Sequence, residues 1–197
     1  MARALAPQAR AGLKGGPKVA AAPGRIYLVG FMGSGKTTAG RVLAGRLGVP
    51  FVDLDLAFEA MAGRTIRETF ETHGEPWFRE REAELLRGTA SLPAAVVALG
   101  GGTFAFPGNR EFVKSHGLSV FLDVPFEVIA DRLAGKTADR PLFPSEETAR
   151  ELWEARLASY RMADRTLEVT RDMTAAVVAG RIADLAAPPL ETSGGVA

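Results

Sequence analysis

The sequence predicts an α/β fold, a three-layer sandwich in which a five-stranded parallel sheet lies between layers of helices. Short apolar, β-branched runs alternate with longer segments of helical periodicity along most of the chain, and this alternation is typical of parallel sheets covered on both faces. The chain has 197 residues, of which 47% are hydrophobic, and this is enough for one compact domain with a sizeable core.

Each element has its own signal in the sequence. Five short apolar runs are predicted as strands, at residues 26–29, 51–53, 95–99, 119–122 and 166–169. Seven helical patterns are predicted, at 35–47, 56–62, 65–73, 75–88, 125–133, 146–162 and 174–185. Thr65 and Glu68 have the spacing of a capping box. Pro76 and Pro125 lie where the first turn of a helix tolerates a missing N–H.

We expect one domain over residues 25–186, flanked by disordered tails at 1–24 and 187–197. The first 24 residues are rich in Ala, Gly and Pro and contain basic residues but no acidic one. This stretch lacks the apolar core of a secretory signal, which leaves an organelle-targeting segment or a misassigned start codon as alternatives.

The charge and the cysteine content argue against several classes of protein. The formal net charge is +1, so no overall field favours nucleic acid or a membrane surface, and no apolar run approaches the ~20 residues of a membrane span. The chain has no cysteine, which excludes disulfides and thiolate metal sites and fits a reducing compartment. We therefore expect a cytoplasmic protein that acts on small molecules. Nothing suggests an obligate interface, so we expect a monomer.

A phosphate-binding loop follows the first predicted strand. Residues 30–37 read GFMGSGKT, which matches the pattern G-x-x-x-x-G-K-[ST] and lies between a strand and a helix, as the motif requires. Its glycines let backbone N–H groups turn toward a polyphosphate, and the following helix adds the positive end of its dipole. Lys36 supplies a charge for the β- and γ-phosphates, and the Thr37 hydroxyl is a candidate Mg²⁺ ligand. The chain is therefore expected to bind ATP or GTP.

Two acidic residues, Asp53 and Asp55, end the second predicted strand beside this loop. One carboxylate at a strand tip can hold Mg²⁺ through water, while the other hydrogen-bonds the hydroxyl group of a phosphate acceptor. The alternative is a structural role in which Asp55 caps a helix that begins at Leu56.

Other residues offer groups for an acceptor. The glycines at 100–102 end the third strand, where they admit a ligand to backbone N–H groups or form a flexible turn. Arg79 follows Phe78, with Phe70 one helix earlier. Arg79 and Glu82 are i, i+3 neighbours and can pair. Such an arginine suits a small anion with an apolar ring, and the alternative is an ordinary surface residue.

Two more arginines have a functional and a structural interpretation. Arg140 lies in a loop with two prolines, where it could belong to a mobile lid that brings charge onto the transferring phosphoryl group, or be an exposed cation. Arg156 shares a helix face with Tyr160 at i, i+4, and the alternative is a surface arginine beside a half-buried tyrosine.

Taken in order, these motifs resemble shikimate kinase, a family of small P-loop kinases of the nucleoside-monophosphate-kinase-like type. The resemblance runs from about residue 25 to about residue 185. It rests on residues 30–38, 51–55, 66–70, Gly74-Glu75, Phe78-Arg79, Glu82, Gly100-Gly101-Gly102, Asn109-Arg110, Arg140-Pro141-Leu142, Arg156 and Tyr160. It implies a P-loop kinase fold with a mobile lid.

The resemblance also implies catalytic and metal-binding roles. Lys36 would hold the β- and γ-phosphates, and Arg140 would close onto them from the lid. Asp55 would bind the hydroxyl that is phosphorylated and is a candidate base. Thr37 and Asp53 would hold Mg²⁺, Asp53 through water.

The binding residues divide between the two substrates. The ATP site implied by the resemblance consists of Gly33, Ser34, Gly35, Lys36, Thr37, Thr38, Arg132 and Arg140, with Arg132 stacked on the adenine. The implied shikimate site consists of Asp55, Phe70, Phe78, Arg79, Gly100, Gly101, Gly102 and Arg156. Arg79 and Arg156 would grip the carboxylate, because paired charge-assisted hydrogen bonds orient as well as bind.

The implied reaction converts MgATP and shikimate to ADP and 3-phosphoshikimate. A gluconate-type or other small-metabolite kinase is one alternative, although it gives less reason for two arginines to converge on a carboxylate. A non-catalytic ligand sensor on the same fold is another. The intact Lys36, Thr37, Asp53 and Asp55 argue against a silent site, and 24 residues rich in Gly, Ala and Pro cannot form a helix-turn-helix domain.

Overall fold

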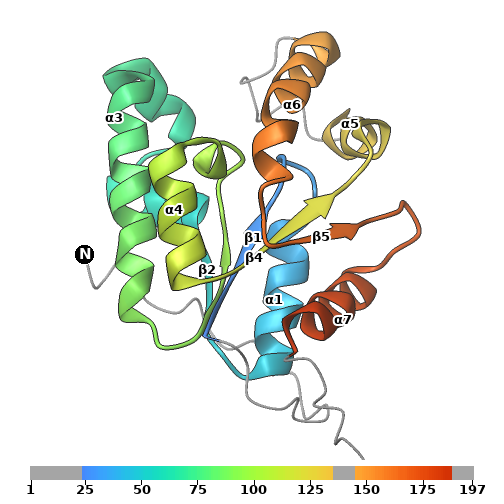
Figure 1. Cartoon of the computed structure of the whole chain (residues 1–197). Helices are drawn as coiled ribbons and strands as arrows, with labels where there is room; N and C mark the ends of the chain where they lie inside the picture. Colours follow the sequence, from blue (N-terminus) through green and yellow to red (C-terminus); the bar gives the residue numbers. More distant parts are fainter. Residues whose placement is uncertain (1–23, 135–144, 188–197) are drawn as a thin grey trace, which may run out of the picture.

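The fold is built on a parallel sheet of five strands, which confirms the sequence prediction. The structure, a computed structural model, describes residues 24–134 and 145–187. The strands are β1 (Arg25–Val29), β2 (Phe51–Asp53), β3 (Ala95–Ala98), β4 (Gly117–Asp123) and β5 (Arg165–Glu168). They lie in the order β2-β3-β1-β4-β5, and each neighbouring pair is parallel (Figure 1). The carboxyl ends of all five strands therefore meet at one edge.

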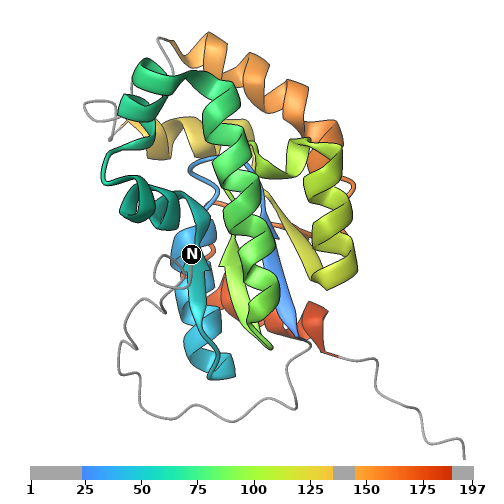
Figure 2. The same ribbon diagram turned by 90° about the vertical axis from the view of Figure 1, so that its left-hand side faces the viewer.

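Helices cover both faces of the sheet. The described helices are α1 (Lys36–Leu47), α2 (Leu54–Ala62), α3 (Ile66–Gly88), α4 (Pro107–His116), α5 (Phe126–Ala134), α6 (Glu146–Tyr160) and α7 (Ala175–Ala186). Short 3₁₀ turns are η1 (Thr89–Ser91) and η2 (Thr103–Ala105). α1 and α7 pack together on one face, and α3 and α4 lie on the other (Figures 1 and 2).

The centre of the sheet is closed to solvent on both sides. Residues 26–29 of β1 and 95–98 of β3 are all buried, which explains why these strands are continuous apolar runs with no alternation. Close packing extends to α1, which meets the sheet at Gly40. A Cβ at this position would lie 2.5 Å from the Phe51 ring and 3.0 Å from Leu28. Only glycine lets α1 approach the sheet so closely.

Replacing Gly40 by alanine is expected to lower the free energy of unfolding by about 1–3 kcal/mol, because overpacking a full core forces side chains and backbone to shift. Urea unfolding followed by circular dichroism measures this loss.

The matched control is Gly108→Ala in α4, where an added Cβ meets nothing within 4 Å. This change should be neutral or slightly stabilising, because alanine is the better helix former. Equal losses in the two variants would contradict the packing explanation for Gly40.

The helices differ from the sequence prediction in three places. α2 begins at Leu54, two residues earlier than expected. The two helices predicted at 65–73 and 75–88 meet as α3, with a sharp kink at Gly74, where φ is 80°. The capping box at Thr65 that opens α3 is confirmed. α4 has no counterpart in the prediction, because the Pro107-Gly108 pair at its start has the composition of a turn.

Some predictions fall on other parts of the chain. Arg140, the predicted lid arginine, lies outside the described residues, as do the two predicted tails apart from residues 24 and 187. Among the residues that the structure describes, no helix is long and apolar enough to cross a membrane.

Candidate active site

The phosphate loop leaves β1 at the carboxyl edge of the sheet and leads into α1. Gly35 is the N-cap of α1 and adopts a left-handed conformation with φ of 95°, which glycine accepts without strain. No side chain caps this helix end, so its first N–H groups are directed at the space in front of the loop. A helix N-terminus of this kind is a ready-made anion site.

Two side chains of the loop fit a bound phosphate. The hydroxyl of Ser34 is buried and has no hydrogen-bond partner among the described residues. A buried polar atom of this kind is costly unless a ligand satisfies it. The Lys36 ammonium is also buried, and it donates to the carbonyl oxygens of Gly30 (2.7 Å) and Phe31 (2.9 Å). The predicted phosphate-binding side chains therefore lie together inside the loop.

Thr37 and Asp53 form the predicted pair beside this loop. The Thr37 hydroxyl donates to Asp53 Oδ2 at 2.6 Å, and Oδ1 of the same carboxylate accepts from the N–H groups of Asp55 (3.2 Å) and Leu56 (3.3 Å). Asp53 is thus the N-cap of α2, and the alternative in which Asp55 caps the helix is wrong. The hydroxyl and carboxylate oxygens of Thr37 and Asp53 are hard ligands of the kind that Mg²⁺ prefers. The described residues contain no group of three or more acidic or histidine ligands.

Because Asp53 caps α2, the Asp55 side chain is available to the site. The pKa of Asp55 is raised well above its ordinary value. Burial, followed by the negative charges of Asp53 and Glu82, raises its pKa from 3.8 to about 7, while Lys36 acts in the opposite direction. The Oδ1 atom of Asp55 lies 2.6 Å from the position that a Cβ would occupy at Gly100. Gly100 therefore leaves room for this carboxylate, a role that differs from direct contact with a ligand.

Arg79 is held on several sides. Its Nη1 atom donates to Glu82 Oε2 at 2.9 Å, as the predicted i, i+3 pair, and Nε and Nη2 donate to Glu75 Oε1 at 3.0 and 2.9 Å. Its guanidinium carbon lies 4.9 Å from the centre of the Phe78 ring and 5.3 Å from that of Phe106.

Gly102 packs directly against the Arg79 guanidinium. A Cβ at Gly102 would lie 2.8 Å from Nη2, so no larger residue fits without displacing the arginine. The buried carboxylate of Glu82 links this pair to the next turn, because its Oε1 accepts from the Thr103 hydroxyl at 2.6 Å.

Phe78 and Phe70, the two rings expected to line the substrate, lie close together but differ in exposure. Phe78 is 3% exposed and packs edge-to-face on Phe70 (4.8 Å between ring centres) and Phe58 (4.7 Å). Phe70 is half-buried. Phe78 thus reaches the site mainly through the guanidinium of Arg79 on its ring.

Arg156 and Arg132 approach the site from α6 and α5. Arg156 Nη1 lies 3.7 Å from the Cβ position at Gly101, and Tyr160, one turn later, donates its hydroxyl to the Gly101 carbonyl. Arg132 Nη1 donates to the carbonyl of Gly33 in the phosphate loop at 3.0 Å. Arg156 therefore joins the glycine segment, and Arg132 joins the phosphate loop.

Three contacts of this site were not predicted from the sequence. Glu75 stands one helical turn before Arg79, so its i, i+4 spacing could have indicated the ion pair. Thr103 and Phe106 follow the glycine segment without any local signal. Their approach to Glu82 and Arg79 depends on how η2 packs against α3.

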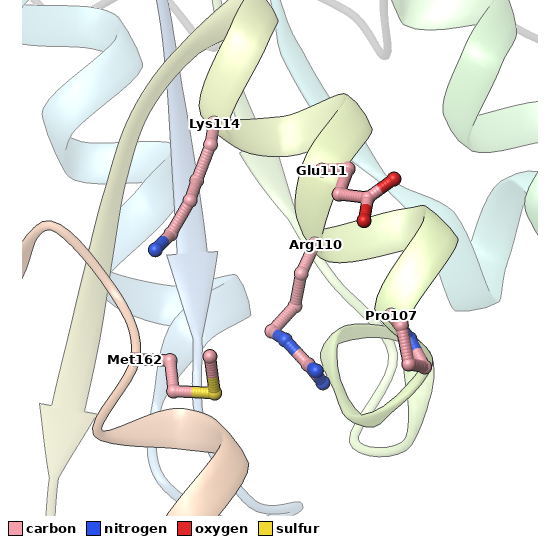
Figure 3. Close-up of a pocket in the computed structure, with 5 residues that line it drawn as sticks. All are labelled: Pro107, Arg110, Glu111, Lys114 and Met162. Carbon is pink, nitrogen blue, oxygen red and sulfur yellow. The ribbon is translucent and has the colours of Figure 1, made fainter.

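A small hollow lies between α4 and Met162, in the turn that follows α6 (Figure 3). It is lined by Pro107, Arg110, Glu111, Lys114 and Met162. Its volume of about 130 Å³ falls below the ~300 Å³ of the smaller ligand pockets, so we assign it no ligand.

Comparison with known proteins identifies the family of this chain. The family model described as "Shikimate kinase" matches residues 32–186. The shikimate kinase of Salinibacter ruber is 40% identical over 174 residues, covering 83% of this chain and 84% of that protein, and the shikimate kinase of Thermosynechococcus vestitus is 45% identical over 160 residues, covering 80% and 86%. The structure of shikimate kinase from Acinetobacter baumannii in complex with shikimate aligns with a TM-score of 0.76 and 41% identity, covering 82% of this chain and 92% of that one. By the family model, the relatives and the shared fold, the chain belongs to the shikimate kinase family.

Proposed function

We propose that this chain transfers the γ-phosphoryl group of ATP to the 3-hydroxyl of shikimate, giving ADP and 3-phosphoshikimate. The observation that carries the proposal is the arrangement around Asp55. The charge of Lys36 in the phosphate loop acts on Asp55, and Gly100 beside Asp55 begins the glycine segment against which Arg79 and Arg156 lie. A phosphate loop suits a nucleotide, and two arginines suit the carboxylate of the acceptor. The family match favours this reaction over a gluconate-type kinase and over a non-catalytic sensor.

The nucleotide half is expected to work by position and charge. Phosphate oxygens would satisfy the buried hydroxyl of Ser34 and the N–H groups at the start of α1, and they would draw the Lys36 ammonium from the loop carbonyls. Arg132, which already contacts the loop at Gly33, is the residue that we expect beside the adenine. Arg140 is proposed to add charge from the lid.

Thr37 and Asp53 would hold the Mg²⁺ that accompanies ATP, because they present adjacent hard oxygens to the loop. Mg²⁺ keeps several water molecules and binds through one or two protein groups plus phosphates, so the small ligand set is sufficient. The bound ion would neutralise negative charge on the phosphate oxygens during transfer.

The acceptor half would orient shikimate and receive a proton. Asp55 would accept a hydrogen bond from the 3-hydroxyl, and with a pKa of about 7 it is well matched to take up the proton at neutral pH. The hydroxyl oxygen would attack the γ-phosphorus directly, with ADP as the leaving group and no phosphorylated protein intermediate. Arg79 and Arg156 would fix the carboxylate.

The identity of the product tests this proposal. Incubation of the protein with ATP, Mg²⁺ and shikimate should yield one new phosphomonoester signal in the ³¹P spectrum, coupled to the proton on carbon 3 of the ring. The absence of any new phosphomonoester, or coupling to another ring position, would contradict the proposed reaction.

The carboxylate-binding role of Arg79 gives a second prediction. Arg79→Lys should raise KM for shikimate by about tenfold to a hundredfold, because lysine cannot form the planar paired hydrogen bonds and charged hydrogen bonds contribute about 1.5–3 kcal/mol. KM for ATP should stay within about twofold. Steady-state kinetics with each substrate varied in turn measures both constants.

Arg81→Lys is the matched control, because Arg81 lies on the same helix and pairs with Glu84 at 2.7 Å outside the site. Its kinetics should equal those of the wild type. An equal rise of both KM values in Arg79→Lys would indicate a general loss of structure and would count against the assigned role. The monomeric state and the cytoplasmic location expected from the sequence stay predictions.

A further inference from the structure

Side chains of α4 donate hydrogen bonds to the backbone of η2, the turn that follows the glycine segment at 100–102. Asn109 Nδ2 donates to the carbonyl of Thr103 at 3.1 Å. Arg110 Nη1 donates to the carbonyls of Phe104 (3.2 Å) and Ala105 (2.8 Å). The guanidinium of Arg110, which also borders the hollow in Figure 3, is thereby committed to the backbone of η2. Every carbonyl of η2 thus accepts a hydrogen bond from α4.

Each carbonyl of the glycine segment accepts a hydrogen bond, but only that of Gly101 does so from a side chain. The carbonyls of Gly100 and Gly102 accept from the backbone N–H groups of Thr103 and Ala105, both at 3.1 Å. The hydroxyl of Tyr160 donates to the carbonyl of Gly101. Within residues 24–134 and 145–187, the N–H groups of Gly101 and Gly102 donate to no backbone acceptor. The glycine segment therefore keeps two N–H donors for a ligand, and the Gly101 carbonyl between them is bonded to Tyr160.

The geometry of the peptide bond links these two observations. The Gly101 carbonyl and the Gly102 N–H belong to one peptide plane, and in a trans peptide they point in opposite directions. A peptide between two glycines can rotate between alternative orientations at little cost, because glycine is permissive in φ and ψ. A donor that fixes the carbonyl of Gly101 therefore also fixes the direction of the Gly102 N–H.

Tyr160 is well placed to act as such a donor. Its side chain is 1% exposed and packs beside Phe121 at 5.4 Å between ring centres. Burial raises its pKa to about 12, and the nearby guanidinium groups of Arg156 and Arg79 oppose that rise. The phenol is therefore protonated at any ordinary pH, and it lies close to both arginines of the acceptor side.

We propose that Tyr160 is a positioning residue: it pins the Gly101–Gly102 peptide so that the Gly102 N–H and the Arg156 guanidinium face the substrate carboxylate together. This inference rests on the proposed function and adds a residue that acts on the substrate through others. Tyr160 follows Arg156 by one turn of α6, so the same contact fixes the position of the helix that carries the arginine.

Tyr160→Phe tests the proposal, because it removes the hydroxyl and keeps the ring. We expect KM for shikimate to rise by about three- to tenfold, in line with the loss of one buried hydrogen bond. We expect kcat and KM for ATP to stay within about twofold of the wild type, since neither depends on the Gly102 N–H.

The chain offers a matched control in Tyr27→Phe. Tyr27 is also fully buried, and its hydroxyl bonds to the Thr89 hydroxyl at 3.0 Å. Thr89 lies in η1, just before β3, at the amino edge of the sheet, whereas the site lies at the carboxyl edge. Both variants should lose similar amounts of stability in urea unfolding, but Tyr27→Phe should keep wild-type kinetics.

An unchanged KM for shikimate in Tyr160→Phe would overturn the inference. So would an equal rise of KM for shikimate in Tyr27→Phe, or an equal rise of KM for ATP in Tyr160→Phe. A failure of the proposed function looks different, because the wild-type protein itself would then not phosphorylate shikimate.

Discussion

Replacing Lys36 by alanine is expected to lower kcat for ATP-dependent phosphorylation of shikimate by about 10²–10³-fold or more, the usual cost of removing one preorganised charge-stabilising donor. The Lys36 ammonium is buried inside the phosphate loop, where it bonds to the carbonyls of Gly30 and Phe31. Alanine leaves the strand, the loop glycines and α1 in place but removes the positive charge that the β- and γ-phosphates require. An assay that couples ADP release to a colour change measures the loss.

The control for this prediction is Lys114→Ala. Lys114 is exposed on α4, beside the hollow in Figure 3, and its removal should leave kcat and both KM values unchanged. The far-ultraviolet circular dichroism of both variants should match the wild type. A folded Lys36→Ala variant with more than about a tenth of the wild-type kcat would remove the assigned ATP site, since it would mean a loss of less than about 1.4 kcal/mol.

Asp55→Asn is expected to act mainly on kcat, with a fall of about 10²–10⁴-fold, the range typical of a positioned general base. The amide keeps the shape of the side chain and can still contact the acceptor hydroxyl, so KM for shikimate should change little. It cannot take up the proton that leaves the hydroxyl oxygen.

The pH dependence of the same variant gives an independent check. Because the pKa of Asp55 is raised to about 7, kcat/KM of the wild type should rise with pH up to about 7 and then level off. Asp55→Asn should lack this rise. Rate measurements between pH 5.5 and about 9, in buffers of constant ionic strength, compare the two profiles.

The stability of Asp55→Asn should change with pH in a defined direction. The pKa of Asp55 is about 7 in the folded state and 3.8 in the ordinary, unfolded state. Between these two pH values the folded protein keeps a proton on Asp55 that the unfolded chain has lost. Its favourable contribution is present below about pH 4 and disappears as the pH rises through about 7. The asparagine variant, which cannot ionise, should therefore gain stability relative to the wild type at pH 8 but not at pH 4.

Asp184→Asn on the exposed side of α7 is the control for both measurements. It should reproduce the wild-type pH profile and show no such gain. A rise of kcat/KM near pH 7 that persists in Asp55→Asn would assign that titration to another group.

The strands and most helices could be predicted because their signals are local. The buried runs of β1 and β3 are continuous apolar segments, and the capping box at Thr65 is complete within four residues. α4 was not predicted, because Pro107 and Gly108 indicate a turn when they are considered alone. Its helical state depends on packing against β4 and η2, which the chain order does not reveal.

In the site too, features with a local signal could be predicted and features that depend on packing could not. The phosphate loop, Asp53 and Asp55 follow strands that end at one edge, so a parallel sheet brings them together. The role of Gly100 could not be predicted, because its missing side chain makes room for the carboxylates of Asp55 and Glu82 from two other elements.

The alternative in which Asp55 caps α2 is wrong for a related reason. Asp53 and Asp55 are two residues apart, and only the structure shows that the Asp53 side chain turns toward the N–H groups of the helix. That assignment leaves Asp55 for the acceptor.

The most direct test of the central claim is the rate of ADP release with a panel of acceptors: shikimate, quinate, gluconate and a set of nucleoside monophosphates. The placement of Arg79 and Arg156 beside the glycine segment predicts a kcat/KM for shikimate at least about a hundredfold above that of the nucleoside monophosphates, which carry no carboxylate. This ratio corresponds to about 2.7 kcal/mol of selectivity. The family match predicts the same preference over quinate and gluconate. A comparable or higher kcat/KM for gluconate or a nucleoside monophosphate would contradict the claim.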